Sequence, residues 1–270
     1  AEAGEQRHAA SLRGCHTSGS PVADATEECG WNKDASGIPL YLVGDSNAEQ
    51  FTEAVVGAGE LLDRPVWVTT GSACPFVDGI EVLEPTDTDE FLPGSVAHTA
   101  YDHCPEYVAK TLEWLEASPP GVVFVASLDQ YWWDSEMGAQ AVGGHPEYAE
   151  SAKLALMEEG LSSAVRRVEA AGHRVVLVQS IPTYRNPTPI WEPSACSIVT
   201  YALRGCHRTL PIDVVDGIQS PTRSAINRVA QQTRASVLDL RQEYCQAGEC
   251  STDRAGVSLY RDATHITVEE

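Results

Sequence analysis

A serine in the first fifth of the chain and a histidine near its end are the residues best suited to covalent chemistry. Ser46 follows a short apolar run and a Gly-Asp pair, and Asp262 and His265 lie three residues apart near the end of the sequence. A serine hydroxyl becomes an effective nucleophile when an imidazole removes its proton and a carboxylate orients that imidazole. Within a tight turn, Asp262 can reach one ring nitrogen of His265 and leave the other free for Ser46. These three residues predict a Ser-His-Asp site for acyl transfer.

Each residue also has a simpler interpretation when it is taken alone. A serine in a Gly-Asp-Ser turn commonly caps a helix. A histidine close to a chain end is commonly solvated or caps a helix. The order of the three residues along the chain, together with the fold predicted below, favours the catalytic interpretation.

The elements that must position these residues alternate between strands and helices. Short apolar runs, typical of strands buried on both faces, occur at Ile38–Val43, Val66–Thr69, Val122–Ala126, Val175–Val178 and Val237–Leu240. Helical periodicity occurs between them, at Asn47–Leu62, around Tyr107–Leu115, at Glu147–Ala171 and at Arg223–Arg234. The alternation predicts a single three-layer α/β domain over residues 1–270, with a mostly parallel five-stranded sheet covered on both faces.

Two segments lack this periodicity. Residues 1–36 are predicted to form an N-terminal extension that carries a disulfide, and residues 181–221 a long surface excursion. In a parallel sheet, ligands bind beyond the carboxyl ends of the strands. Ser46 and Gly71 follow the first two predicted strands, so both are expected at that edge.

The composition excludes several classes of partner. The 270 residues include 18 basic and 39 acidic side chains, which gives a net charge of −21. Such a field repels phosphate backbones, so we expect no nucleic-acid partner. No apolar run is long enough to span a bilayer, and the start at Ala1 lacks a signal-peptide pattern, which indicates a piece of a longer protein. We expect no cofactor and no metal, because the chain has neither a CxxC pair nor a calcium-loop pattern.

The cysteine count indicates the compartment. An even number of cysteines, eight, favours disulfides in an oxidising, extracytoplasmic location over the alternative of reduced, buried thiols in a cytosolic enzyme. The sequence alone does not fix the connectivity. We expect neighbours in order to pair: Cys15–Cys29, Cys74–Cys104, Cys196–Cys206 and Cys245–Cys250.

The stretch GDSN at Ser46 and the stretch RDATHIT at Arg261–Thr267 resemble the SGNH, or GDSL-like, hydrolase superfamily. More narrowly, they resemble the SGNH domain fused behind the membrane-embedded acyltransferase-3 domain of bacterial surface-glycan O-acyltransferases. The resemblance implies a flavodoxin-like fold, with Ser46 as the nucleophile, His265 as the general base and Asp262 as the residue that orients it.

The resemblance also implies an oxyanion hole formed by the backbone N–H groups of Ser46 and Gly71. The asparagine that the superfamily carries after its third strand is missing, and the residues Ala-Ser-Leu-Asp stand in its place. Ser127, Gln130 and the Asn47 side chain are the candidates for the third donor. Alternatively, two backbone donors suffice.

These features together predict an extracytoplasmic, serine-dependent O-acyl (acetyl) transferase or esterase that acts on a cell-envelope carbohydrate or glycolipid. Its partners would be an acyl donor, a sugar acceptor and a membrane acyltransferase domain in the same full-length chain, which would tether it to the membrane. One alternative is a secreted, stand-alone carbohydrate esterase or lipase. The other is a non-catalytic sugar-binding module, which the absent asparagine favours.

Overall fold

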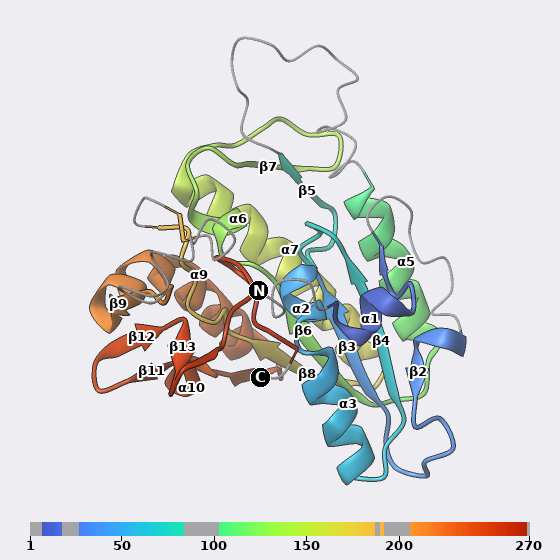
Figure 1. Ribbon diagram of the computed structural model, residues 1–270. Coiled ribbons are helices and arrows are strands. Elements are labelled where there is room, and N and C mark those ends of the chain that lie inside the picture. The colour runs from blue at the N-terminus through green and yellow to red at the C-terminus, as the bar shows by residue number, and fades with distance from the viewer. Residues whose placement is uncertain (1–6, 18–26, 84–102, 187–189, 192–205, 269–270) are drawn as a thin grey trace.

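A twisted, mostly parallel sheet forms the centre of the computed structural model, which describes residues 7–17, 27–83, 103–186, 190–191 and 206–268 (Figure 1). The strands of its main path run in the order β1-β4-β3-β6-β8-β10, and β2 pairs with β4. Their bounds are β1 His16–Thr17, β2 Gly30–Trp31, β3 Leu40–Gly44, β4 Val66–Gly71, β6 Val122–Ala126, β8 Arg174–Val178 and β10 Ser236–Leu238. All of these pairs are parallel except β2 with β4.

The five predicted strands are β3, β4, β6, β8 and β10. The sheet is wider than predicted, because β1 and β2 extend it from the N-terminal segment. Each of these two strands has only two residues, which is too short to leave a periodic pattern in the sequence. The N-terminal segment therefore lies beside the carboxyl end of β4, where His16 pairs with Thr70 and Thr17 with Gly71.

Helices cover both faces of this sheet. The long helices are α3 Thr52–Leu61, α5 Cys104–Ala117, α7 Glu150–Ala170 and α9 Ile212–Gln232, and the short ones are α1 Ala9–Leu12, η1 Glu27–Cys29, α2 Ser46–Glu49, α6 Gln130–Trp133 and α10 Arg241–Tyr244. Four minor pairings join β5 Ile80–Leu83 with β7 Gly138–Ala141, β12 Glu249–Ser251 with β9 Thr209–Pro211 and with β11 Cys245–Gln246, and β13 Asp253–Arg254 with β14 Val257–Ser258.

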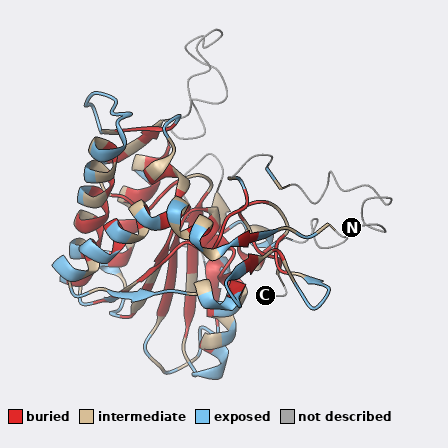
Figure 2. Ribbon diagram, turned by 90° about the vertical axis from the view of Figure 1, so that its left-hand side faces the viewer, coloured by how far each residue is buried: buried red, intermediate tan, exposed pale blue. Residues whose placement is uncertain are grey.

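Alternating side chains of β3 separate the hydrophobic core into two layers. Tyr41 and Val43 belong to a cluster with buried residues of α5, α7 and α9, whereas Leu40 and Leu42 belong to a cluster with α2, α3 and the C-terminal segment. The two-residue period follows from the pleat of the strand. In Figure 2 the strands are buried between helices whose outer faces are exposed. The C-terminal segment therefore packs on the same face as the helix that begins at Ser46.

The predicted helix over residues 47–62 is divided into α2 and α3. At the break, two side chains donate hydrogen bonds to backbone carbonyl oxygens. Gln50 Nε2 donates to Asn47 O at 3.0 Å, and Thr52 Oγ1 donates to Glu49 O at 2.6 Å. The Phe51 N–H donates instead to Ala48 O, which tightens the turn. The break gives α2 its own direction at the edge of the sheet.

The last long helix, α9, begins earlier than predicted, at Ile212 instead of Arg223. Pro221 lies inside the helix and lacks the N–H that would bond Gly217 O. The hydroxyl of Ser220 reaches that carbonyl at 3.5 Å. A proline usually marks a helix boundary, which is why periodicity alone placed the start too late.

Three of the four predicted cysteine pairs are disulfides. The Cα atoms lie 5.6 Å apart in Cys15–Cys29, 5.0 Å in Cys74–Cys104 and 3.9 Å in Cys245–Cys250. The fourth predicted pair, Cys196–Cys206, includes Cys196, which lies outside the described residues. The first bridge ties β1 to the segment that carries β2, and the second ties the residues after β4 to the start of α5.

Removal of the Cys74–Cys104 bridge by a double alanine substitution is expected to lower the free energy of unfolding by about 3.5 kcal/mol, because the bridge closes a long loop. Its two cysteines lie 30 residues apart, against 5 for Cys245–Cys250. Removal of the Cys245–Cys250 bridge, which closes the shorter loop, is expected to lower the free energy of unfolding by about 2 kcal/mol. Urea denaturation of both double variants measures the difference, and a larger loss in the Cys245–Cys250 variant would contradict the expectation.

No helix within the described ranges has both the length and the apolar character that a membrane crossing requires.

Candidate active site

Ser46 is the first residue of α2, directly after the turn that leaves β3. Gly44 in that turn has φ +139°, and a Cβ atom there would lie 1.9 Å from Ala126 O. Only glycine fits this close approach of two strands. Asp45 caps α2 by accepting a hydrogen bond from the Asn47 N–H at 2.7 Å. The turn therefore presents the Ser46 hydroxyl at the carboxyl edge of the sheet, beside a helix N-terminus.

The structure brings Ser46, His265 and Asp262 into one hydrogen-bonded chain. His265 Nε2 lies 2.8 Å from Ser46 Oγ, although 219 residues separate them in sequence. His265 Nδ1 lies 2.9 Å from each carboxylate oxygen of Asp262. An ionised carboxylate only accepts, so Nδ1 carries the proton and Nε2 presents its lone pair to the serine hydroxyl. In this tautomer His265 can remove the proton of Ser46.

The carboxylate of Asp262 stays ionised in this environment. Burial opposes the charged form, but hydrogen bonding to His265, the charge of His265, the Thr264 N–H and nearby Arg261 together lower the pKa of Asp262 below its ordinary value. The Thr264 N–H donates to Asp262 at 2.8 Å and the His265 N–H at 2.9 Å. The same contacts fix the direction of the carboxylate toward the imidazole.

Three further contacts hold the Asp262–His265 turn against the rest of the molecule. The Ile266 N–H donates to Gln50 Oε1 at 2.9 Å, which joins the turn to the end of the helix that carries Ser46. The Tyr184 N–H donates to Ala263 O at 2.7 Å. The Tyr260 hydroxyl donates to Pro182 O at 2.8 Å. Hydrogen bonds from the end of α2 and from the segment after β8 therefore hold this turn in place.

Gly71, the second predicted oxyanion donor, ends β4 beside Ser46's strand. The N–H groups of Thr70 and Ser72 donate to Cys15 O and Thr17 O in the β1 segment, at 3.0 and 2.6 Å. Successive N–H groups of a strand point in opposite directions. The N–H group of Gly71 therefore faces the end of β3. A Cβ atom at Gly71 would lie 3.0 Å from the Tyr107 ring, so a side chain there would have to displace that ring slightly. Its role as a donor to a ligand stays a prediction.

Comparison with known proteins places the chain in a family. Residues 14–269 match the family described as "SGNH domain (fused to AT3 domains)". The chain belongs to this SGNH domain family. The superfamily comprises esterases and acyltransferases. No curated protein matches the chain.

Several solved structures are similar to this chain at low sequence identity. The periplasmic domain of a lipopolysaccharide acetyltransferase from Salmonella ser. Paratyphi A has a TM-score of 0.57 and 11% identity, over 99% of this chain and 94% of that one. A GDSL-like lipase from Bacteroides thetaiotaomicron has a TM-score of 0.39 and 10% identity, over 85% and 80%. A mutant acetyl-xylooligosaccharide esterase from Geobacillus Stearmophilus has 0.38 and 14%, over 77% and 78%.

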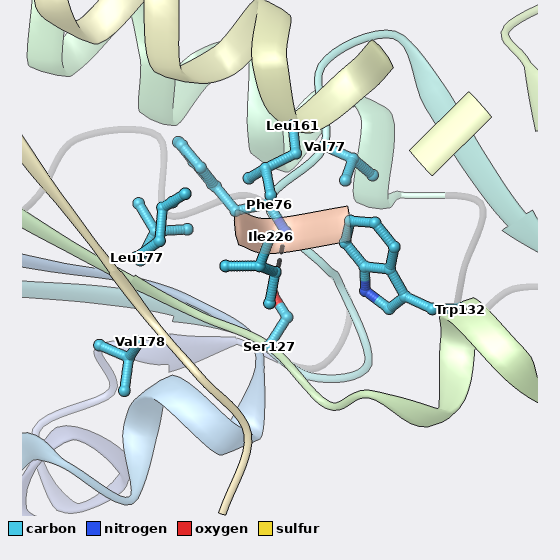
Figure 3. Close-up of a pocket in the computed structure, with 9 residues that line it drawn as sticks. Phe76, Val77, Ser127, Trp132, Leu161, Leu177, Val178 and Ile226 are labelled. Carbon is cyan, nitrogen blue, oxygen red and sulfur yellow. Dashed lines mark hydrogen bonds between the residues drawn. The ribbon is translucent and has the colours of Figure 1, made fainter. Parts of the chain in front are cut away.

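The three candidates for the third oxyanion donor of the SGNH domain differ in what their side chains contact. Gln130 Nε2 donates to Asp134 at 2.6 Å. Ser127 Oγ accepts from the Phe76 N–H at 3.3 Å and lines a small, mainly apolar cavity between the sheet and helices α7 and α9 (Figure 3). Asn47 is 3% exposed, and its Nδ2 has no partner in the described part of the chain. Asn47, next to Ser46, is therefore the candidate with an unused buried donor.

Asp45 connects the two segments that build the SGNH site. One carboxylate oxygen accepts from the Asn47 N–H, and the other accepts from the Leu128 N–H at 2.8 Å. Leu128 belongs to the segment that replaces the superfamily's asparagine block. Burial raises the pKa of Asp45 to about 6, against hydrogen bonds from Leu128 and Asn47 that favour the ionised form. The carboxylate thus holds the altered block in place beside Ser46.

Asp45→Asn is expected to flatten the pH dependence of stability between about pH 4 and 6. The unfolded-state pKa of an aspartate is about 3.9, so the folded protein keeps this proton to higher pH than the unfolded chain. The stabilising contribution of Asp45 is therefore complete below pH 4 and falls as the pH rises through 6. Urea unfolding of the wild type and the variant across this range measures the difference, and parallel curves would contradict the raised pKa.

Sequence reasoning missed the residues that brace the site. Gln50 and Leu128 are not recognisable from the local sequence, because each forms its hydrogen bond with a residue far away in the chain, Gln50 with Ile266 and Leu128 with Asp45. The one group with metal-ligand spacing among the described residues is Cys74, His103 and Cys104, and its two cysteines form a disulfide.

Proposed function

We propose that this SGNH domain transfers an acyl group through a covalent intermediate on Ser46, as the extracytoplasmic part of a membrane acyltransferase that modifies a cell-envelope carbohydrate or glycolipid. The observation that carries the proposal is the continuous contact from Ser46 Oγ to His265 Nε2 and from His265 Nδ1 to Asp262. The family's fusion to AT3 domains supports the membrane tether, and the disulfides support the compartment.

In the first half-reaction, His265 Nε2 takes the proton of Ser46 while Oγ attacks the acyl carbonyl carbon. The N–H groups of Ser46 and Gly71 stabilise the oxyanion of the tetrahedral intermediate. The intermediate collapses to an ester on Ser46, and the leaving group departs with the proton from His265. Asp262 stabilises the imidazolium that forms on the way.

In the second half-reaction, an acceptor hydroxyl approaches the acylated Ser46. His265 Nε2 takes its proton as the hydroxyl oxygen attacks the ester carbonyl. The new ester forms, and the proton returns from His265 to Ser46 Oγ. With a sugar hydroxyl the product is an acylated sugar, and with water it is a free acid.

A competition between acceptors tests the proposal. The domain is supplied with p-nitrophenyl acetate in the presence and absence of methyl glucoside, and acetyl-glucoside and free acetate are quantified. We expect p-nitrophenol release with acetyl-glucoside among the products. Release of acetate alone at every glucoside concentration would favour the stand-alone esterase or lipase. No release above the uncatalysed rate would favour the sugar-binding module, which the missing asparagine favours.

A further inference from the structure

A second histidine, His16 in β1, lies at the same edge of the sheet as Ser46. β1 runs parallel to β4, and His16 pairs with Thr70, one residue before Gly71. His16 Nδ1 lies 2.9 Å from Thr70 Oγ1 and 4.0 Å from Glu49 Oε2. Glu49 is the last residue of α2, whose first residue is Ser46. The imidazole of His16 is therefore held between the strand of Gly71 and the helix of Ser46.

Charged residues at the Asp262–His265 turn influence the pKa of the His16 ring. Burial lowers the pKa of His16, Glu49 opposes the shift, and the charges of His265 and Arg261 lower the pKa further. The charge of the candidate base thus acts on His16, although the two residues come from opposite ends of the chain.

The outer nitrogen of the ring remains available to a ligand. Glu49 and Thr70 both lie at the Nδ1 side, and a carboxylate there favours the proton on Nδ1. Nε2 then presents a lone pair. Within the described segments Nε2 has no hydrogen-bond partner, and the His16 side chain keeps 13% of its surface exposed.

We propose that His16 forms an acceptor subsite, in which Nε2 accepts a hydrogen bond from one hydroxyl of a polyhydroxylated acceptor while a neighbouring hydroxyl attacks the acylated Ser46. The inference rests on the acyl-transfer function proposed above. A lone pair selects a hydroxyl donor, and His265 already serves as the base. A carbohydrate with adjacent hydroxyls can place one oxygen at Ser46 and donate from the other to His16, whereas water and methanol each have a single oxygen atom.

The ratio of transfer to hydrolysis tests this subsite, because both reactions consume the same acyl-enzyme and the ratio does not depend on how fast it forms. The ratio is measured with methyl glucoside and, separately, with methanol. His16→Asn retains a donor toward Thr70 and removes the outer nitrogen. We expect it to lower the methyl glucoside ratio about tenfold, the value of one net hydrogen bond, and to leave the methanol ratio unchanged.

Two further variants complete the design. His16→Gln places a polar atom near the position of Nε2 and is expected to recover part of the glucoside ratio. His145→Asn changes an exposed histidine outside the site and is expected to match the wild type. If His16→Asn leaves both ratios unchanged, or lowers them equally, the subsite is wrong while the proposed function stands. If the wild type acylates neither alcohol, the transfer function itself fails, and the subsite with it.

Discussion

Ser46→Ala will reduce the turnover of p-nitrophenyl acetate by about 10⁴-fold or more, to the uncatalysed rate if the wild type is slow. The substitution removes the atom that forms the covalent intermediate, and loss of a serine nucleophile from a Ser-His-Asp site typically has an effect of at least this size. Alanine is a good helix former, so α2 keeps its N-terminal turn and its Asp45 cap. Steady-state kinetics measures the effect on kcat.

The matched control is Ser220→Ala. Ser220 is an exposed serine of α9, and its hydroxyl donates to the carbonyl of Gly217 in its own helix. Its substitution will leave kcat at the wild-type value. Equal turnover by the wild type and Ser46→Ala, with both proteins folded, would remove Ser46 from the reaction.

Asp262→Asn will lower kcat by about 10³- to 10⁴-fold and leave KM within about twofold. The carboxylate accepts from His265 Nδ1 and thereby keeps the Nε2 lone pair on Ser46. An amide presents either a donor or a weaker acceptor to Nδ1, so the imidazole loses both its tautomer and the stabilisation of its charged form. The effect on kcat without an effect on KM distinguishes this role from one in binding.

Asp239→Asn serves as the control for a lost carboxylate charge. Asp239 is paired with Arg223 on the surface and makes no contact with His265. We expect full activity from this variant. If the two variants lose activity to the same extent, the effect follows from net charge, and Asp262 has no specific role in orienting His265.

The sequence predicts the part of the fold that depends on local patterns. All five predicted apolar runs are strands of the sheet, but the expected burial on both faces is wrong for β10, an edge strand whose three residues are exposed. Gly172 follows the end of the long helix α7 with φ +93°, a conformation that glycine adopts without strain. These elements are specified by neighbours in sequence.

The parts that could not be predicted depend on contacts between distant residues. β1 and β2 are two-residue segments that form strands only by hydrogen bonding to β4. The Cys15–Cys29 bridge holds them beside it. For the same reason His16 carries no signal, because its position beside α2 follows from strand pairing. The single-domain boundary over residues 1–270 stays a prediction.

The site shows the same division. The types and spacing of Asp262 and His265 identify them as a pair, and the turn of Ser46 identifies a possible nucleophile. What holds the two ends together is the bond from Ile266 to Gln50 and the packing of the C-terminal segment on α2. Neither contact is encoded in a local pattern. The oxyanion hole is the least predictable part, because the asparagine block is replaced and the unpartnered buried donor among the described candidates, Asn47 Nδ2, comes instead from α2.

The central claim is that Ser46 becomes covalently acylated with His265 as its base. The most direct measurement is intact-protein mass spectrometry after treatment with a fluorophosphonate, followed by peptide mapping. The account predicts one adduct per chain, located on Ser46, and its loss in both Ser46→Ala and His265→Ala. An adduct on another residue, or equal labelling of the wild type and Ser46→Ala, would contradict it.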